Sequence, residues 1–201
     1  MNKKEIVQKV IENNGGIAKT SDFADKGINK YEVAELCKEG LIKRIRRGFY
    51  QLPQSNAPTE EQLIHELLPQ GIICVESALF HYGYSDFSPR EWSIAVPRTA
   101  SRAVKNIEEF PIRAYYTQKE FLAIGKSVDN FNDVLLPVYD RERTICDCFK
   151  YRTKLDNEIF NKAVNAYAVD EKKNLANLSK YAKEMKLYAR VMNVMEVLLN
   201  G

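Results

Sequence analysis

The densest run of basic side chains in the sequence occupies residues 43–47 and could neutralise phosphates. It places Lys43, Arg44, Arg46 and Arg47 within five positions, and a glycine and two aromatic residues follow directly. Such a run either solvates a small protein or lies against a polyanion. Residues 1–55 contain 11 Lys or Arg and 7 Asp or Glu, whereas residues 56–201 contain 19 and 20. The net positive charge therefore lies entirely at the front of the chain, which predicts a polyanionic partner for that part alone.

A second stretch that could do chemistry, residues 140–147, alternates acids with arginines. The carboxylates of Asp140, Glu142 and Asp147 could suggest a metal-dependent nuclease. A two-metal site needs carboxylates that converge, and no predicted strand carries the Glu-x-Lys partner expected beside them. Asp140 suits a helix N-cap, and Arg143 and Asp147 are spaced i and i+4 on one helix face. The spacing therefore favours a structural salt bridge over a catalytic site.

The cysteines and histidines do not match a metal site or a catalytic triad. Two of the four cysteines stand alone, and Cys146 and Cys148 are two apart in a helical stretch, where side chains point to different faces. We therefore expect reduced, half-buried thiols. His65 and His81 have no serine or cysteine placed to complete a triad, and the sequence has no G-x-x-x-x-G-K-[ST] loop for nucleotides. The sequence predicts no catalytic residue, no metal ion and no cofactor.

Three short helices and a hairpin must position the basic run. The first helix carries an apolar stripe and ends at the Asn and Gly residues 13–16. The second, residues 20–27, begins with hydroxyl and carboxyl side chains that can cap it, and the third covers residues 29–40. Two strands follow, at residues 41–45 and 49–52, with two arginines and a glycine at their tip. This order of elements predicts a winged helix-turn-helix.

The third helix has an outward face that could enter the major groove of DNA. Val33 and Leu36 begin its inward stripe, which puts Tyr31, Glu35 and Lys38 on the opposite side at about 100° per residue. Lys38 can neutralise a phosphate, and Glu35 could accept a hydrogen bond from a cytosine amino group. A carboxylate facing DNA is unfavourable without such a donor. A solvated salt bridge with Lys38 is therefore the alternative role of Glu35.

The basic hairpin and the third helix together predict contact with DNA. Arginine at the tip of a wing can enter the minor groove or clamp phosphates. The alternative is a helix-turn-helix scaffold that contacts proteins and is merely solvated by its cations. The predicted DNA-binding residues are Lys19, Thr20, Ser21, Lys26, Lys30, Tyr31, Lys38, Lys43, Arg44, Arg46 and Arg47.

Beyond a polar predicted linker at residues 54–58, the pattern becomes mixed. Helices are expected at residues 59–68, 76–82, 141–151, 158–167, 175–185 and 189–199. Strands are expected at residues 92–96, 112–116 and 134–139, and residues 72–75 are expected to form a short apolar strand or a turn. The fold class predicted is therefore α+β, with a winged helix-turn-helix in residues 1–55 and a mixed α/β domain with a helical tail in residues 56–201. No apolar run reaches the roughly 18–20 residues of a membrane span, and the N-terminus is amphipathic, so we expect a cytoplasmic protein without a membrane partner.

Four blocks of sequence, in this order along the chain, resemble the AbiEi antitoxins of the AbiE abortive-infection toxin-antitoxin system. They are residues 47–53 (RGFYQLP), 74–79 (CVESAL) with 81–83 (HYG), 94–98 (IAVPR) and 142–148 (ERTICDC). The resemblance implies a bacterial phage-defence antitoxin with an N-terminal winged helix and a C-terminal antitoxin domain. It also implies repression of its own operon through inverted repeats in the promoter. Finally, it implies antagonism of a neighbouring nucleotidyltransferase-like toxin without a stable complex, which is described as type IV.

The resemblance also marks four residues of the second part, because Arg98, Glu142, Arg143 and Asp147 match recurring positions of that family. They form either a surface used in antitoxicity or an internal network that holds the domain together. Two copies are expected on inverted repeats, from a protein that is a monomer in solution. Two other functions stay open: a winged-helix regulator whose second domain senses a ligand or a protein, and a nuclease or toxin-modifying enzyme.

Overall fold

The computed structural model describes residues 2–53 and 58–200. It divides into two compact units, residues 1–69 with 106–109 and residues 70–105 with 110–201. Each unit has a hydrophobic core of its own. Residues 54–57 of the predicted linker lie outside the described residues, and the domain boundary at residue 55 stays a prediction.

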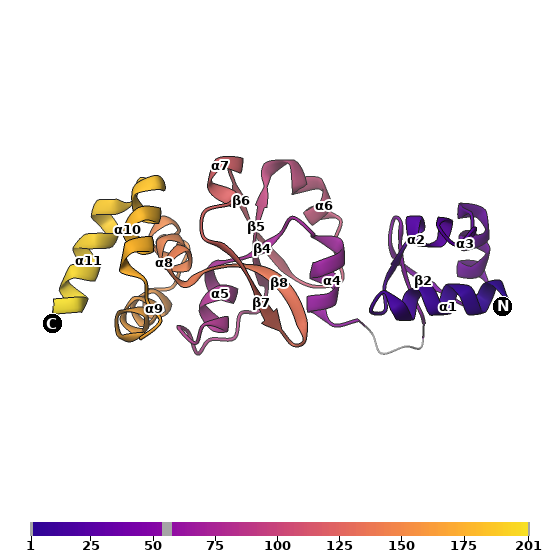
Figure 1. The fold of residues 1–201 in the computed structure, drawn as a ribbon, viewed down its shortest axis with the longest axis horizontal. Coiled ribbons are helices and arrows are strands. Elements are labelled where there is room, and N and C mark those ends of the chain that lie inside the picture. The colour runs from indigo at the N-terminus through magenta and orange to yellow at the C-terminus, as the bar shows by residue number, and fades with distance from the viewer. Residues whose placement is uncertain (1, 54–57, 201) are drawn as a thin grey trace. The chain divides into compact units, whose positions relative to one another are not determined.

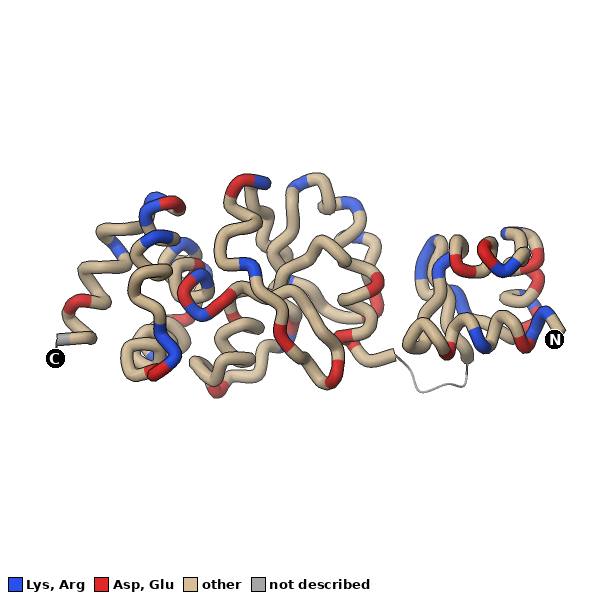
Figure 2. Tube along the Cα trace, in the orientation of Figure 1, with Lys and Arg blue, Asp and Glu red and all other residues tan. Residues whose placement is uncertain are grey.

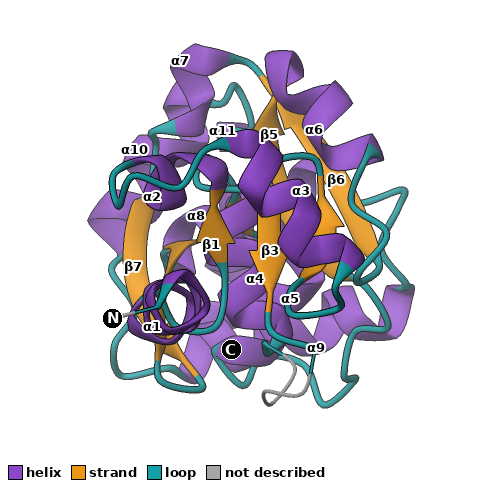
Figure 3. Cartoon of the chain, turned by 90° about the vertical axis from the view of Figure 1, so that its right-hand side faces the viewer, coloured by secondary structure: helices purple, strands orange, loops and turns teal. Residues whose placement is uncertain are grey.

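The first unit contains three helices, a small antiparallel sheet and one further helix (Figures 1 and 3). The three helices are α1 (Lys3–Asn13), α2 (Thr20–Ala24) and α3 (Lys30–Lys38). The strands are β1 (Ala18–Lys19), β2 (Lys43–Arg46) and β3 (Phe49–Gln51), in the order β1-β3-β2. The further helix is α4 (Glu60–Leu67). The order of helices and hairpin in residues 3–51 confirms the predicted winged helix-turn-helix.

A capping box fixes the start of α3, the helix with the predicted outward face. The spacing of Asn29 and Glu32 predicts such a box, and the structure contains it. The Asn29 side chain accepts hydrogen bonds from the backbone N–H groups of Tyr31 and Glu32, and the Glu32 carboxylate accepts one from the Asn29 N–H at 2.9 Å. These bonds satisfy N–H groups that a helix end otherwise leaves unpaired.

The start of α2 differs from the sequence prediction. Lys19, not one of residues 20–22, holds the N-cap position. Of those three residues, Asp22 contributes to the cap from the third helical position, where its carboxylate accepts a hydrogen bond from the Lys19 N–H at 2.8 Å. Lys19 also belongs to β1, which the sequence did not predict because two residues are too few to show a strand pattern. Pairing with β3 creates this strand, with Ala18 opposite Tyr50.

The second unit contains a mixed sheet of five strands (Figure 1). The strands are β4 (Ile72–Ile73), β5 (Trp92–Pro97), β6 (Ile112–Thr117), β7 (Lys126–Phe131) and β8 (Val134–Tyr139), in the order β6-β5-β4-β8-β7. The pairs β5–β6 and β4–β8 are parallel, and the other two pairs are antiparallel. The connections contain α5 (Val75–His81), η1 (Arg98–Ala100), α6 (Ser101–Lys105) and α7 (Lys119–Leu122).

Four helices complete the second unit and form a group beside the sheet (Figure 1). They are α8 (Arg141–Lys150), α9 (Asn157–Val169), α10 (Leu175–Glu184) and α11 (Tyr188–Asn200). All residues of α8 from Glu142 to Phe149 are buried, so this helix is central to the group. The α+β fold class and the helical tail are therefore confirmed. None of the described helices is long and apolar enough to cross a membrane.

Candidate nucleic-acid interface

The start of α2 holds the tip of the basic hairpin. Arg47 and Gly48 join β2 to β3, and the backbone N–H of Thr20 donates to the carbonyl oxygen of Gly48 at 2.9 Å. Lys43, Arg44 and Arg47 are exposed. The hairpin therefore presents three positive charges to solvent from a backbone that α2 fixes in place.

Two of the predicted DNA-binding cations, both only partly buried, instead have partners within the first unit. Arg46 Nη2 donates to the backbone carbonyl of Leu67 at 3.1 Å, and the guanidinium lies 4.4 Å from the centre of the Phe49 ring. Burial lowers the pKa of Arg46, although a guanidinium stays charged in proteins. Lys19 Nζ lies 3.0 Å from a carboxylate oxygen of Glu66. These contacts compete with DNA for both side chains, so the exposed cations of the hairpin are the stronger candidates.

The outward face of α3 has the predicted orientation. Val33 and Leu36 belong to the core of the first unit. On the opposite side, Tyr31 is 72% exposed, and its exposed neighbours on this face are Ala34, Glu35 and Lys38. We call these four residues the reading face. Lys38 Nζ lies 2.7 Å from a Glu35 carboxylate oxygen, and both side chains are exposed, so the predicted solvated salt bridge is confirmed.

Lysines pair with every carboxylate of α3 and of its C-cap. In addition to the Glu35 pair on the reading face, Lys3 pairs with Glu32, and Lys4 Nζ lies 3.0 Å from a carboxylate oxygen of Glu39. The hydrogen bond from Lys3 lowers the pKa of Glu32. A hollow of about 490 Å³ lies among these pairs, between α3 and the start of α1. The sequence analysis did not predict the roles of Lys3 and Lys4. The glutamates of α3 and its C-cap could have indicated them, because these carboxylates need positively charged partners.

The remaining predicted DNA-binding residues of the first unit lie around α2 and α3. Ser21, Lys26 and Lys30 are exposed, and Lys30 Nζ lies 5.1 Å from the centre of the Tyr31 ring. Figure 2 shows basic residues along the hairpin strands, whereas α3 carries both acidic and basic residues. The wing thus offers phosphates a more uniformly positive surface than α3 does.

In the second unit, Arg143 organises a buried network. Its side chain is fully buried, and its Nε donates to Asp147 Oδ1 at 3.1 Å, as the i, i+4 spacing predicts. Its Nη1 donates to the backbone carbonyls of Phe121 at 2.6 Å and Ile124 at 2.9 Å. Asp140 is the predicted N-cap of α8 and accepts from the Arg143 N–H at 2.8 Å. Arg143 therefore ties α8 to the segment between β6 and β7.

Burying the charges of Arg143 and Asp147 costs free energy. Burial raises the pKa of Asp147, and the positive charge of Arg143 opposes that rise. The guanidinium also lies 3.9 Å from the centre of the Tyr139 ring. Removing one partner alone would leave an uncompensated buried charge, whereas the complete pair is neutral and leaves only Arg143 Nη2 without a hydrogen-bond partner among the described residues. This geometry supports a structural role for both residues.

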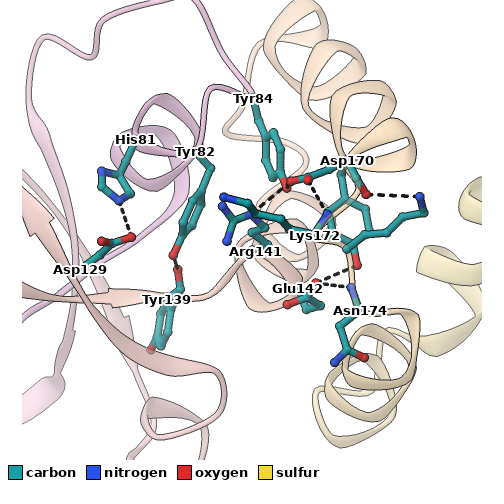
Figure 4. A network of polar contacts seen from close by, with 12 residues as sticks. His81, Tyr82, Tyr84, Asp129, Tyr139, Arg141, Glu142, Asp170, Lys172 and Asn174 are labelled. Carbon is teal, nitrogen blue, oxygen red and sulfur yellow. Dashed lines mark hydrogen bonds and ion pairs between the residues drawn. The ribbon is translucent and has the colours of Figure 1, made fainter.

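Glu142 belongs to a second polar network, which joins α8 to the segment between α9 and α10 (Figure 4). Its carboxylate is buried, and it accepts hydrogen bonds from the Tyr167 hydroxyl at 3.1 Å and the Asn174 N–H at 2.7 Å. Nearby, Asp170 pairs with Arg141 at 3.1 Å. Three of the four residues marked by the family resemblance are thus internal.

The fourth of these residues, Arg98, has a different environment. It lies in η1 and is exposed. It is therefore the one residue of the four that a partner could reach without any change in the fold.

His81 and the buried cysteines have structural surroundings, whereas His65 is exposed. His81 Nε2 lies 2.9 Å from Asp129 Oδ2, and its ring stacks on Phe131 with centroids 4.0 Å apart. Cys37 is partly buried, whereas the three other cysteines are fully buried, so the expectation of half-buried thiols is wrong for those three. The expectation failed for Cys146 and Cys148 because α8 is buried on all sides. No group of three or more His, Cys, Asp or Glu residues in the described ranges could hold a metal ion.

A family model matches part of the first unit, and a solved structure is similar over almost the whole chain. Residues 5–53 match a family model described as "Transcriptional regulator, AbiEi antitoxin", which confirms the resemblance over that stretch. A similar solved structure is that of the RV2827C protein from Mycobacterium tuberculosis. It is 12% identical with a TM-score of 0.61, and the match covers 97% of this chain and 79% of that chain. At this identity the likeness shows the fold alone. No curated protein matches the sequence significantly.

Proposed function

We propose that this protein is the antitoxin of a bacterial abortive-infection system and represses its own operon by binding inverted repeats in the promoter. The observation that carries the proposal is a coincidence of two findings in residues 5–53. This stretch matches the AbiEi regulator family, and it folds into a winged helix with three exposed cations on its hairpin. Binding to operon DNA places the protein in the cytoplasm. It needs neither a cofactor nor a metal ion.

Docking of the winged helix would use its two exposed features for different tasks. Lys43, Arg44 and Arg47 neutralise phosphates beside the groove, which gives most of the affinity and makes it depend strongly on salt. The reading face of α3 enters the major groove and supplies sequence preference. One monomer binds each repeat, so two copies occupy the promoter.

The second unit would act against a nucleotidyltransferase-like toxin encoded beside this gene, without forming a stable complex. The burial of Glu142, Arg143 and Asp147 supports a role for them in maintaining this unit. Exposed Arg98 is the better candidate for an antitoxic surface. The identity of the adjacent open reading frame tests this part directly, since a nucleotidyltransferase is expected there.

A gel-shift titration with promoter DNA tests the DNA-binding part. The variant Lys43→Ala with Arg47→Ala should bind more weakly, and its log K should depend less steeply on log salt, by roughly 0.9 for each phosphate that is no longer neutralised. The matched control is Lys180→Ala with Arg190→Ala, which removes the same charge from exposed positions on α10 and α11. Equal effects of the two double variants would show that the hairpin acts only through the net charge of the protein, which would contradict the docking model.

Co-expression with the adjacent toxin separates antitoxicity from repression. The hairpin double variant should lose repression of a promoter reporter yet still rescue growth, because its second unit is unchanged. Arg98→Ala should reduce rescue and leave repression intact. If the folded full-length protein gives no rescue, the protein is a winged-helix regulator whose second unit senses another signal.

A further inference from the structure

Glu35 differs from the two other glutamates paired with lysines at α3. Glu32 lies about 100° around α3 from Tyr31, Glu39 is the C-cap residue of this helix, and the partners of both come from α1. Glu35 lies on the reading face, and its partner Lys38 comes from the same helix. The side chains of Glu35 and Lys38 are 63% and 74% exposed, so water screens their attraction. This pair can therefore separate at little cost.

DNA would compete for one member of this pair. Lys38 carries a flexible stem and a point charge, and a phosphate offers it a full negative charge. Once Lys38 contacts a phosphate, Glu35 is left without a counter-ion in a groove bordered by negative charge. The carboxylate can remain there only if a base supplies a hydrogen-bond donor.

The hydrogen-bonding groups on the edges of the bases determine which base can donate to the Glu35 carboxylate. In the major groove, guanine and thymine present acceptors to the groove, which repel a carboxylate. Adenine presents its amino group beside the acceptor N7. Cytosine presents its N4 amino group alone. A carboxylate on the reading face therefore favours cytosine, is repelled by guanine and thymine, and binds adenine less well because the acceptor N7 lies beside the amino group.

We propose that Glu35 is the residue that determines base specificity, by accepting a hydrogen bond from cytosine N4 once Lys38 has turned to a phosphate. The inference rests on the proposed DNA-binding function and adds the base that α3 reads. Of the side chains suited to purine contacts, the reading face carries only Lys38, and the proposal assigns Lys38 to a phosphate. Glu35 is then the side chain of this face that favours a C·G pair.

Selection of binding sites from randomised DNA tests this proposal with the full-length protein. The wild type should recover half-sites with one invariant C·G pair, and replacing that pair should weaken binding about 5- to 150-fold, the usual range for one mismatched pair. Glu35→Gln should lose the cytosine and favour adenine, because an amide can donate to N7 and accept from N6. Glu39→Gln is the matched control and should retain the cytosine, because Glu39 is the C-cap residue of α3 and pairs with Lys4 of α1.

Lys38→Ala separates the two members of the pair. This variant should bind more weakly and lose about 0.9 from its salt slope, yet still select cytosine. Circular dichroism checks that every variant keeps the helical content of the wild type. If wild-type protein selects no DNA sequence, the proposed function itself fails. If it selects a sequence whose bases are the same for the wild type and Glu35→Gln, only the assignment of Glu35 is overturned.

Discussion

Gly125 is the position where one added methyl group would test the buried Arg143 network most directly. Its φ is +66°, and a Cβ at this position would lie 2.3 Å from Arg143 Cβ and 2.9 Å from Asp140 Oδ1. Neither neighbour is free to retreat. Arg143 is fixed by Asp147 and two backbone carbonyls, and Asp140 caps α8. Gly125→Ala therefore forces a conflict at the centre of the network.

The expected loss of stability is about 2–5 kcal/mol for the second unit. Left-handed backbone costs a residue other than glycine about 1–2 kcal/mol, and an extra methyl group in filled space costs about 1–3 kcal/mol. Gly83 is the matched control, because its φ is +72° and its Cβ would meet no described atom within 4 Å. Gly83→Ala should lose only the backbone contribution of about 1–2 kcal/mol.

Urea unfolding followed by tryptophan fluorescence measures the difference. Trp92 is the only tryptophan in the sequence and lies in β5, so its emission reports on the second unit. With a slope of about 1–3 kcal/mol per molar urea, Gly125→Ala should unfold roughly 1 M earlier than Gly83→Ala. Coincident midpoints for the two variants would show that Arg143 can move aside. The network would then not be the rigid centre inferred from its contacts.

Three further predictions concern the cap of α3, the thiols and the acid limb of stability. Asn29→Ala removes an N-cap that stabilises α3 by about 1 kcal/mol. Amide hydrogen exchange at Tyr31 and Glu32 should therefore become about fivefold faster, while exchange in α1 is unchanged. Equally faster exchange in both helices would indicate global destabilisation instead. A thiol reagent at pH 8 should modify Cys37 alone in the native protein and all four cysteines in urea, because the three other thiols are fully buried, and burial raises the pKa of Cys146 to about 12. Rapid reaction of Cys146 or Cys148 in the native protein would contradict the packing of α8. The hydrogen bond from His81 lowers the pKa of Asp129 in the folded state. The Asp129 carboxylate therefore contributes its full stabilisation above the usual pKa of about 3.9 and loses it as the pH falls through the lower pKa of the folded state. Asp129→Asn should flatten the fall of the urea midpoint below pH 4, and parallel curves for variant and wild type would refute this.

The elements predicted well from the sequence are those with strong local patterns. The apolar stripe and capping box of α3 fixed both its extent and its outward face, and the spacing of Arg143 and Asp147 predicted their pairing. β7 was missed because five of its six residues are exposed and show no alternation of apolar side chains. Its antiparallel pairing with β8 makes it a strand. Pairing between distant segments leaves little trace in such a short stretch.

The sequence by itself determined the winged helix, its positive charge and the residues that could contact DNA, because helix periods, caps and turns act within about four residues. Only the tertiary structure decided which of these residues stay available. It commits Arg46 to Leu67, brings Lys3 and Lys4 to Glu32 and Glu39, and pairs Glu35 with Lys38 of the same helix. It also buries Glu142, Arg143 and Asp147. A side chain's partner depends on segments that folding brings together, and a charge therefore acquires its role only in the folded chain.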